Sequence, residues 1–419
     1  MRPFDPADVR HRFPALARTQ DGKPVVIADA PGGSQVPDTV IDAVAGMYRR
    51  GISNSGGAFA TSREADATVA DARGAAADLL GTGPERVVFG PNSTTLLFHL
   101  SRSFSRTLSP GDRVVVTRLD HDANIRPWVL AARDAGAEVR WVDVRADDAT
   151  LDLDSFDEAL ATEPKLVAFT LASNAVGTIT PAADLVRRAK RAGALVAVDG
   201  VHLAQHRAIS VDALGADIAV VSPYKIFGPH LGILVGSPAV LDGWDPYRVR
   251  PAEYYPSPAR WETGTPNHEG LAGFSAAVDY LAGTGRAFGS PPDDTRGSAV
   301  RAAFEVFGAH ERGLAARFLQ GLVEIPAARL YGIGDTARIG ERTPTFALRL
   351  GDQDPAKTAA ALGERGIFVW DGHYYAMEVF ERLGILESGG AVRVGFCHYH
   401  TLGEVDRVLE TLADLAVRS

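Results

Sequence analysis

Residues 195–236 read LVAVDGVHLAQHRAISVDALGADIAVVSPYKIFGPHLGILVG. Two runs in this stretch, Leu195–Asp199 and Ile218–Ser222, are continuously apolar rather than alternating, which is typical of strands covered on both faces. Asp199 ends the first run, and Lys225 lies in the turn that follows the second. Ligands of open α/β sheets bind just beyond the carboxyl ends of the strands. We therefore expect Asp199 and Lys225 to point into one crevice.

Similar short runs recur upstream and indicate further buried strands. Helical segments such as Ala183–Ala192 separate them, and strands alternating with helices at this spacing predict an α/β fold with a doubly wound, mainly parallel sheet. We place this large domain at about residues 20–285. Its other predicted strands are Val87–Phe89, Val114–Thr117, Val139–Val142 and Leu166–Leu171.

A second, smaller α+β domain is predicted for residues 298–419, together with residues 1–19. The stretch Gly283–Gly297 is rich in Gly, Pro and Asp and is expected to be the linker. After it we predict a long helical region to Leu322 and a closing helix whose apolar residues recur at helical spacing from Leu402. Between these lie an expected helix at Ala356–Arg365 and strands at Thr345–Leu350, Ile367–Val369 and Val392–Phe396.

The composition excludes several classes of protein. Of the 419 residues, 43 are Lys or Arg and 52 are Asp or Glu, a net charge of −9 that argues against a nucleic-acid partner. No apolar stretch is long enough for a membrane helix, and the first residues do not resemble a secretion signal, so we expect a cytoplasmic protein. The single cysteine, Cys397, rules out an internal disulfide, and no metal site is expected.

The pair Asp199 and Lys225 suggests a particular chemistry. A buried carboxylate resists ionisation unless it has a cationic partner, and a pyridinium nitrogen is such a partner. A lysine nearby supplies the covalent anchor for pyridoxal phosphate. Ser93 and Thr94 begin a predicted helix after a strand, where a phosphate binds well, and His121 follows another strand, where its ring could stack on a flat heterocycle.

These segments together resemble a known family. DHDANIRPW, SNAVGT, VDGVH, SPYK and ETGTPN follow one another as in the cysteine desulfurase/selenocysteine lyase branch of the class V aminotransferases. The resemblance extends from Asp29 to Asp406 and implies the pyridoxal phosphate-dependent fold type I. It also implies a homodimer with a shared active site, because Thr265 matches a threonine that the partner subunit contributes.

The resemblance assigns a role to each matching position. Lys225 matches the lysine that holds the cofactor, Asp199 the partner of the ring nitrogen, and Arg393 the arginine that binds the substrate α-carboxylate. The expected cofactor contacts are Ser93, Thr94, His121, Asn174, Asp199, His202, Ser222, Tyr224, Lys225 and Thr265; the expected substrate contacts are Arg393, His373 and Trp370.

The chain departs from this family where the desulfurase thiol should be. Residues 372–377 read GHYYAM, so Tyr375 replaces the nucleophilic cysteine, and a persulfide on this loop is excluded. Three smaller departures are Tyr224 in place of a histidine, His202 in place of a glutamine and Trp370 in place of a second arginine.

The expected activity follows from this combination. We predict a pyridoxal phosphate-dependent enzyme acting at Cα and Cβ of an amino acid, with Lys225, His121 and Tyr375 as catalytic residues. The leading interpretation is a β-eliminating C–S lyase, because elimination needs no protein nucleophile. The alternatives are an aminotransferase or an amino-acid epimerase, in which Tyr375 or His373 is the second acid, and a cofactor-binding protein without turnover.

Overall fold

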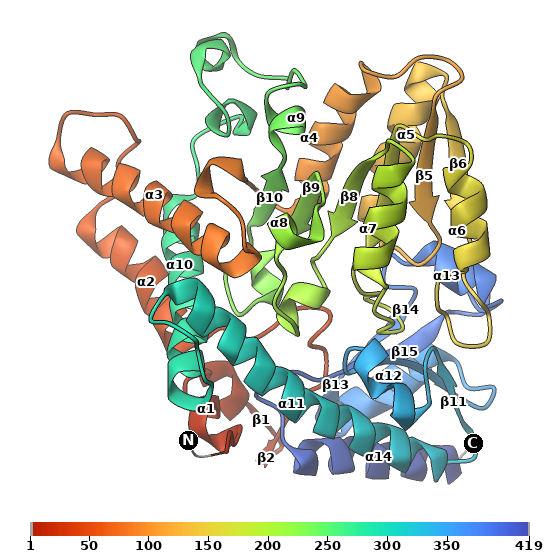
Figure 1. The fold of residues 1–419 in the computed structure, drawn as a ribbon. Coiled ribbons are helices and arrows are strands. Elements are labelled where there is room, and N and C mark those ends of the chain that lie inside the picture. Colours follow the sequence, from red (N-terminus) through yellow and green to blue (C-terminus); the bar gives the residue numbers. More distant parts are fainter. Residues whose placement is uncertain (1–2, 418–419) are drawn as a thin grey trace.

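The computed structural model describes residues 3–417, and its largest feature is a seven-stranded sheet of order β4-β10-β9-β8-β7-β5-β6 (Figure 1). Only β10 runs antiparallel to its neighbours, β4 and β9, which confirms the predicted mainly parallel, doubly wound sheet. The strand β10 itself was not predicted. The strands are β4 Val87–Gly90, β5 Arg113–Thr117, β6 Glu138–Val142, β7 Leu166–Thr170, β8 Leu195–Asp199, β9 Ile218–Val221 and β10 Gly232–Gly236.

Both faces of the inner strands of this sheet are buried, which explains their continuous apolar runs. In β5, Val115 packs into one core, while Val114 and Val116 pack into the core on the opposite face. Side chains alternate between the faces of a strand, so a strand covered on both sides must be apolar throughout. The helices α4 Ser93–Ser105 and α5 Arg126–Ala135 cover one face; α3 Ala60–Leu80, α6 Leu153–Leu160 and α7 Ala182–Arg191 contribute to the core on the other.

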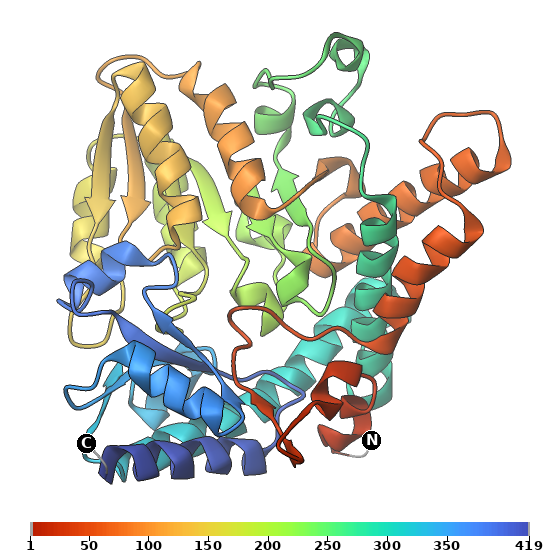
Figure 2. The same cartoon turned by 180° about the vertical axis from the view of Figure 1, so that it is seen from behind.

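A smaller antiparallel sheet of order β11-β12-β15-β14 lies below the large one in Figure 2, where α14 runs along its outer side. Its core joins Phe346 and Leu348 of β12 to Phe318 of α11 and Val408 of α14. The elements are β11 Ala328–Tyr331, β12 Thr345–Leu350, β14 Trp370–Gly372, β15 Ala391–Gly395, α11 Arg296–Val323, α12 Pro355–Glu364 and α14 Leu402–Val417.

The predicted linker is shorter than expected. Helix α10, His268–Phe288, continues through Gly283 and Gly285, and α11 begins at Arg296. Gly285 stays helical because α11 packs directly against it: a Cβ there would lie 1.8 Å from the carbonyl oxygen of Ala299. The glycine therefore serves close helix packing and does not end the helix.

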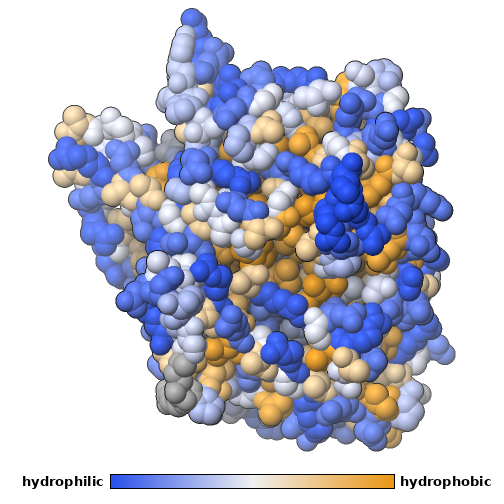
Figure 3. Space-filling view, in the orientation of Figure 1, coloured by the Kyte–Doolittle hydropathy of each residue, from blue (hydrophilic) through white to orange (hydrophobic). Residues whose placement is uncertain are grey.

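The N-terminal segment lies against the smaller sheet. Strand β3, Val26–Ile27, pairs in parallel with β13, Ile367–Phe368, and Asp29 forms a bridge with Gly395. The remaining elements are α1 Ala7–Arg10, β1 Thr19–Gln20, β2 Lys23–Pro24, α2 Asp38–Arg50, α8 Val211–Leu214, α9 Pro238–Leu241 and α13 Met377–Arg382. None of the helices in residues 3–417 is long and apolar enough to cross a membrane. In the view of Figure 3, polar side chains cover most of the surface, and apolar ones show mainly near the middle of the face.

Candidate active site

A cavity of about 450 Å³ opens at the carboxyl ends of the parallel strands. Nine of the ten predicted cofactor contacts line it, although they come from five separate stretches of the chain. They are Ser93, Thr94, His121, Asn174, Asp199, His202, Ser222, Tyr224 and Lys225, and they are joined by Ala123, Thr170, Ala172 and Val201.

Lys225 and Asp199 give this cavity a reactive amine and a buried carboxyl group. Burial and the charge of Arg393 together lower the pKa of Lys225 to about 8, while Asp199 and Asp29 oppose the shift. Burial also raises the pKa of Asp199 to about 6, against the hydrogen bond that its Oδ1 accepts from the Val201 N–H at 2.8 Å. A substantial fraction of Lys225 is therefore an uncharged nucleophile near neutral pH.

The N-terminus of α4 forms the second part of the cavity. Ser93 Oγ donates to the Val221 carbonyl at 2.8 Å and lies 2.8 Å from Ser222 Oγ. The backbone of β10 approaches closely at this point, since a Cβ on Gly232 would lie 2.3 Å from the carbonyl carbon of Asn92. Backbone N–H groups and hydroxyls at a helix N-terminus favour a phosphate group.

His121 presents a neutral ring to the cavity. The Ala123 N–H donates to its Nδ1 at 3.0 Å, so the proton of the neutral ring is on Nε2. Burial, together with the charges of Lys225 and Arg393, lowers the pKa of His121 to about 3. An uncharged imidazole is suited to stacking on a flat ring.

Two lining residues have buried polar atoms that find no hydrogen-bond partner within residues 3–417: His202 Nδ1 and Asn174 Oδ1. The opposite nitrogen of His202, Nε2, lies 3.0 Å from Thr343 Oγ1 and 3.1 Å from Thr345 Oγ1. Buried polar atoms are rarely left unpaired, so both positions are suited to a polar ligand.

Arg393 lies beside the cavity and is already paired. Its Nη2 lies 3.0 Å from Asp29 Oδ1, and its Nη1 donates to the Asn174 carbonyl at 3.2 Å. Asp29 was not predicted as a site residue from the sequence. The local signal that could have identified it is its position after an apolar segment and before a Pro-Gly-Gly turn. That turn is built around the carboxylate, because a Cβ on Gly32 would lie 2.2 Å from Asp29 Oδ2.

The loop at residues 372–377 covers His121 but does not line the cavity. The Tyr375 ring stacks on His121 with centroids 5.5 Å apart and planes at 28°. The Tyr375 N–H donates to His373 Nδ1 at 3.2 Å, and Trp370, just before the loop, stands opposite Arg393 in the β14–β15 pair.

Comparison with known proteins identifies the family. The family model Aminotransferase class-V matches residues 26–288 and 300–408. The chain belongs to this family.

The relatives of this chain indicate which branch of the class V aminotransferases it is most similar to. The cysteine desulfurase of Serratia proteamaculans (strain 568) is 30% identical over 419 residues, 96% of each chain, and the probable cysteine desulfurase of Streptomyces coelicolor is 31% identical over 428 residues, 98% of this chain and 96% of the relative. The apo structure of the cysteine desulfurase of Thermococcus onnurineus NA1 superposes with a TM-score of 0.88 at 26% identity, covering 100% of this chain and 99% of the other. The chain is therefore a cysteine desulfurase-like member of a pyridoxal phosphate-dependent enzyme family with fold type I.

The single cysteine of this protein does not line the cavity that contains Lys225. Cys397 is buried, its Sγ lies 3.8 Å from His400 Nδ1, and burial raises its pKa well above the usual value. The neighbouring histidines also have other partners, since His400 Nε2 lies 2.9 Å from the Ile27 carbonyl and His398 Nε2 lies 2.7 Å from Tyr280 OH. These contacts make residues 397–400 part of the packing.

Thr265, the tenth predicted cofactor contact, lies elsewhere in the single chain. Its loop lines two other cavities, of about 1320 and 1020 Å³, together with Thr263, Gly264 and Pro266.

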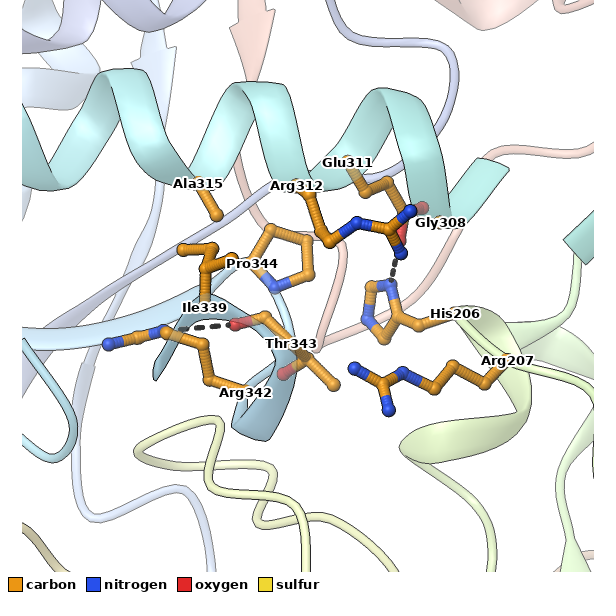
Figure 4. A pocket seen from close by; sticks show the side chains of 10 residues that line it. All are labelled: His206, Arg207, Gly308, Glu311, Arg312, Ala315, Ile339, Arg342, Thr343 and Pro344. Atoms are coloured by element: carbon orange, nitrogen blue, oxygen red, sulfur yellow. Dashed lines mark hydrogen bonds and ion pairs between the residues drawn. The ribbon is translucent and has the colours of Figure 1, made fainter. Parts of the chain in front are cut away.

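A separate cavity of about 300 Å³ is lined by His206, Glu311 and three arginines, Arg207, Arg312 and Arg342 (Figure 4). His206 Nδ1 lies 2.9 Å from Glu311 Oε2, and Arg342 donates to backbone carbonyls, including that of Thr345 at 2.5 Å. The His206 ring also contacts His202, with centroids 5.1 Å apart. No lysine lines this cavity, so we assign the candidate active site to the cavity that contains Lys225.

The Lys225 cavity fits pyridoxal phosphate by its donor set. Lys225 offers the amine for the aldehyde, Asp199 a carboxylate for the ring nitrogen, and the start of α4 a phosphate cradle. The unpartnered atoms of His202 and Asn174 suit the polar substituents of the ring. The residues therefore match the cofactor on which the family depends.

Proposed function

We propose that this protein holds pyridoxal phosphate on Lys225 and cleaves the Cβ–S bond of a cysteine-derived amino acid by β-elimination, without an enzyme persulfide. The observation that carries this proposal is the place of Tyr375, which lies over His121 where the desulfurase relatives would need a thiol. The only cysteine, Cys397, is buried and does not line the cavity.

In this proposal the bound cofactor supplies an electron-accepting ring that stabilises negative charge at the substrate Cα. Asp199 keeps the ring nitrogen protonated, and Ser93, Thr94 and Ser222 hold the phosphate. Arg393 orients the substrate through its α-carboxylate, a contact that its remaining donors allow.

Two side chains, those of Lys225 and Tyr375, transfer protons in the proposed reaction. Once the substrate amine has taken its place on the cofactor, the released Lys225 amine would accept the Cα proton, which a lysine of lowered pKa can do near neutral pH. The Cβ–S electron pair leaves with sulfur, and the Tyr375 hydroxyl protonates the departing thiolate. Water then converts the unsaturated amine to a 2-oxo acid and ammonium, so the products balance without an oxidant or a sulfur acceptor.

The test is product analysis with S-substituted cysteines. We expect thiol, 2-oxo acid and ammonium in equal amounts from the wild type and none from Lys225→Ala. Exchange of the Cα hydrogen for deuterium without any thiol would overturn elimination and favour the epimerase or aminotransferase alternative. Cyanide-labile sulfur on the protein after incubation with cysteine would overturn the persulfide-free route.

The proposed enzyme is a homodimer in which Thr265 completes the partner's site. Thr265 lies outside the Lys225 cavity of its own chain, and large hydrophobic side chains of the preceding segment, such as Tyr247, Tyr254 and Tyr255, are exposed. Mixed dimers of Lys225→Ala and Thr265→Ala chains would contain one intact site. We expect an equal mixture to recover about a quarter of wild-type activity; no recovery would place Thr265 in its own chain's site, and a fully active Thr265→Ala homodimer would place it outside both sites.

A further inference from the structure

The segment in which Tyr375 replaces the desulfurase cysteine carries three exposed large hydrophobic side chains. Trp370 is 57% exposed, Tyr375 is 68% exposed and Met377 is 45% exposed. Large apolar side chains gathered on a surface mark a place where a ligand or partner is bound. These side chains lie beside the candidate active site, so the side chain of a bound substrate would be close enough to contact them.

Trp370 forms one side of this region, next to the carboxylate anchor. It is directly opposite Arg393 in the antiparallel pair of β14 and β15. Side chains opposite one another in such a pair point to the same face, with Cβ atoms about 5 Å apart. The indole therefore stands beside the guanidinium that would hold the α-carboxylate.

Tyr375 forms the other side, over His121. The Asp122 N–H donates to the Tyr375 carbonyl at 2.7 Å, and Asn174 Nδ2 donates to the Tyr374 carbonyl at 3.0 Å. Tyr374 and Tyr375 have φ of 50° and 58°, a left-handed conformation that is costly for aromatic residues. The two hydrogen bonds offset this cost and hold the Tyr375 ring on His121.

Tyr374 and Tyr375, in the turn that follows Trp370, contact Arg393 and His121, respectively. The Arg393 guanidinium lies 4.5 Å from the centre of the Tyr374 ring, and the next residue, Tyr375, covers His121. A substrate whose amine is held by the bound cofactor and whose carboxylate is held by Arg393 would thus have the aromatic rings of Tyr374 and Tyr375 beside it.

We propose that Trp370 and Tyr375 form a subsite for an aromatic ring, so that the substrate is a cysteine S-conjugate whose sulfur carries an aryl group. This inference rests on the proposed function and specifies its substrate class. An aromatic thiolate is also a good leaving group, which suits a route without a protein nucleophile. Aromatic rings prefer to stack on other rings beyond the gain from burial alone, whereas a saturated ring of equal size gains only the burial.

The test compares two ligands that cannot eliminate: L-homophenylalanine, the carbon isostere of S-phenylcysteine, and its cyclohexyl analogue. Calorimetry on the protein reconstituted with pyridoxal phosphate measures both affinities. We expect the phenyl compound to bind about tenfold more tightly, and the preference to fall to about one in Trp370→Leu and in Tyr375→Leu. Tyr375→Phe keeps the ring and should keep the preference.

Met377→Leu is the matched control, because Met377 is exposed in the same segment but contributes no ring; its preference should equal that of the wild type. Equal affinity for the two ligands in the wild type overturns the aromatic subsite. If the leucine variants weaken the dimer and leave the preference unchanged, the rings are subunit contacts, and the inference is equally overturned. A protein that shows no cofactor absorbance defeats the proposed function instead, and calorimetry still reports the ligand preference separately.

Discussion

The Nη2 atom of Arg393 lies 3.0 Å from Oδ1 of Asp29, a residue 364 positions earlier in the chain. Arg393, which is expected to bind the α-carboxylate of the substrate, is therefore already paired with the carboxylate of Asp29. Its Nε has no hydrogen-bond partner in the described part of the chain, so donors remain for a second carboxylate. Asp29 offsets the buried charge of Arg393 and holds its guanidinium in one orientation.

Removing the Asp29 charge should destabilise the protein. Because the two side chains are only 19% and 5% exposed, Asp29→Asn should lower the free energy of unfolding by about 1–3 kcal/mol, measured in urea. The double variant with Arg393→Gln should lose less than the sum of the two single variants. Additive losses would show that the pair does not interact. The exposed pair Arg133–Asp134 is the control, and Asp134→Asn should cost less than about 0.5 kcal/mol.

The Gly32→Ala variant should disturb the same ion pair from the backbone side. The added methyl group would lie 2.2 Å from Asp29 Oδ2, so the carboxylate must move away from Arg393. We expect a loss of unfolding free energy similar to that of Asp29→Asn and weaker binding of amino acids. Gly363→Ala, where a Cβ meets nothing within 4 Å, should not destabilise the protein. Equal thermal stability of the two alanine variants would contradict the packing argument.

The pH dependence of cofactor uptake should report the lowered pKa of Lys225. Only the neutral amine attacks the aldehyde, so the rate should rise with pH to a plateau with a midpoint near the pKa of about 8. At pH 7 about one tenth of the amine is neutral, against about one in three thousand for an ordinary lysine. Stopped-flow absorbance measures the rate, and a profile still rising in proportion to hydroxide at pH 10 would refute the lowered value.

Asp29→Asn provides the matched variant for this profile. The Asp29 charge raises the pKa of Lys225, so its removal should move the midpoint to lower pH. An unchanged midpoint would mean that Asp29 does not act on the amine.

The thiol of Cys397 should be inert in the folded protein. It is buried and its pKa is raised, so it remains protonated at neutral pH and out of reach of reagents. A thiol-reactive dye should label it only after unfolding, and Cys397→Ala should retain elimination activity. Rapid labelling of the native protein, or loss of activity with the fold intact, would return this cysteine to the mechanism.

The features of this protein that depend on short segments could be predicted from the amino-acid sequence. Continuous apolar runs predicted five strands of the large sheet, because a strand buried on both faces has no polar side to show. The sixth predicted strand, β6, lies at the edge of the sheet and is buried only at Val142. Strand ends then predicted that Asp199 and Lys225 share a cavity, since parallel strands deliver their carboxyl ends to one edge.

The contacts between distant segments could not be predicted from local patterns, because they form when the elements pack together. The pairing of Asp29 with Arg393 depends on the N-terminal segment lying against β15, which no local pattern reveals. The same holds for the Tyr375 ring over His121 and for the position of Thr265 outside the cavity of its own chain. Periodicity is a property of neighbouring residues, whereas these contacts arise from how whole elements pack.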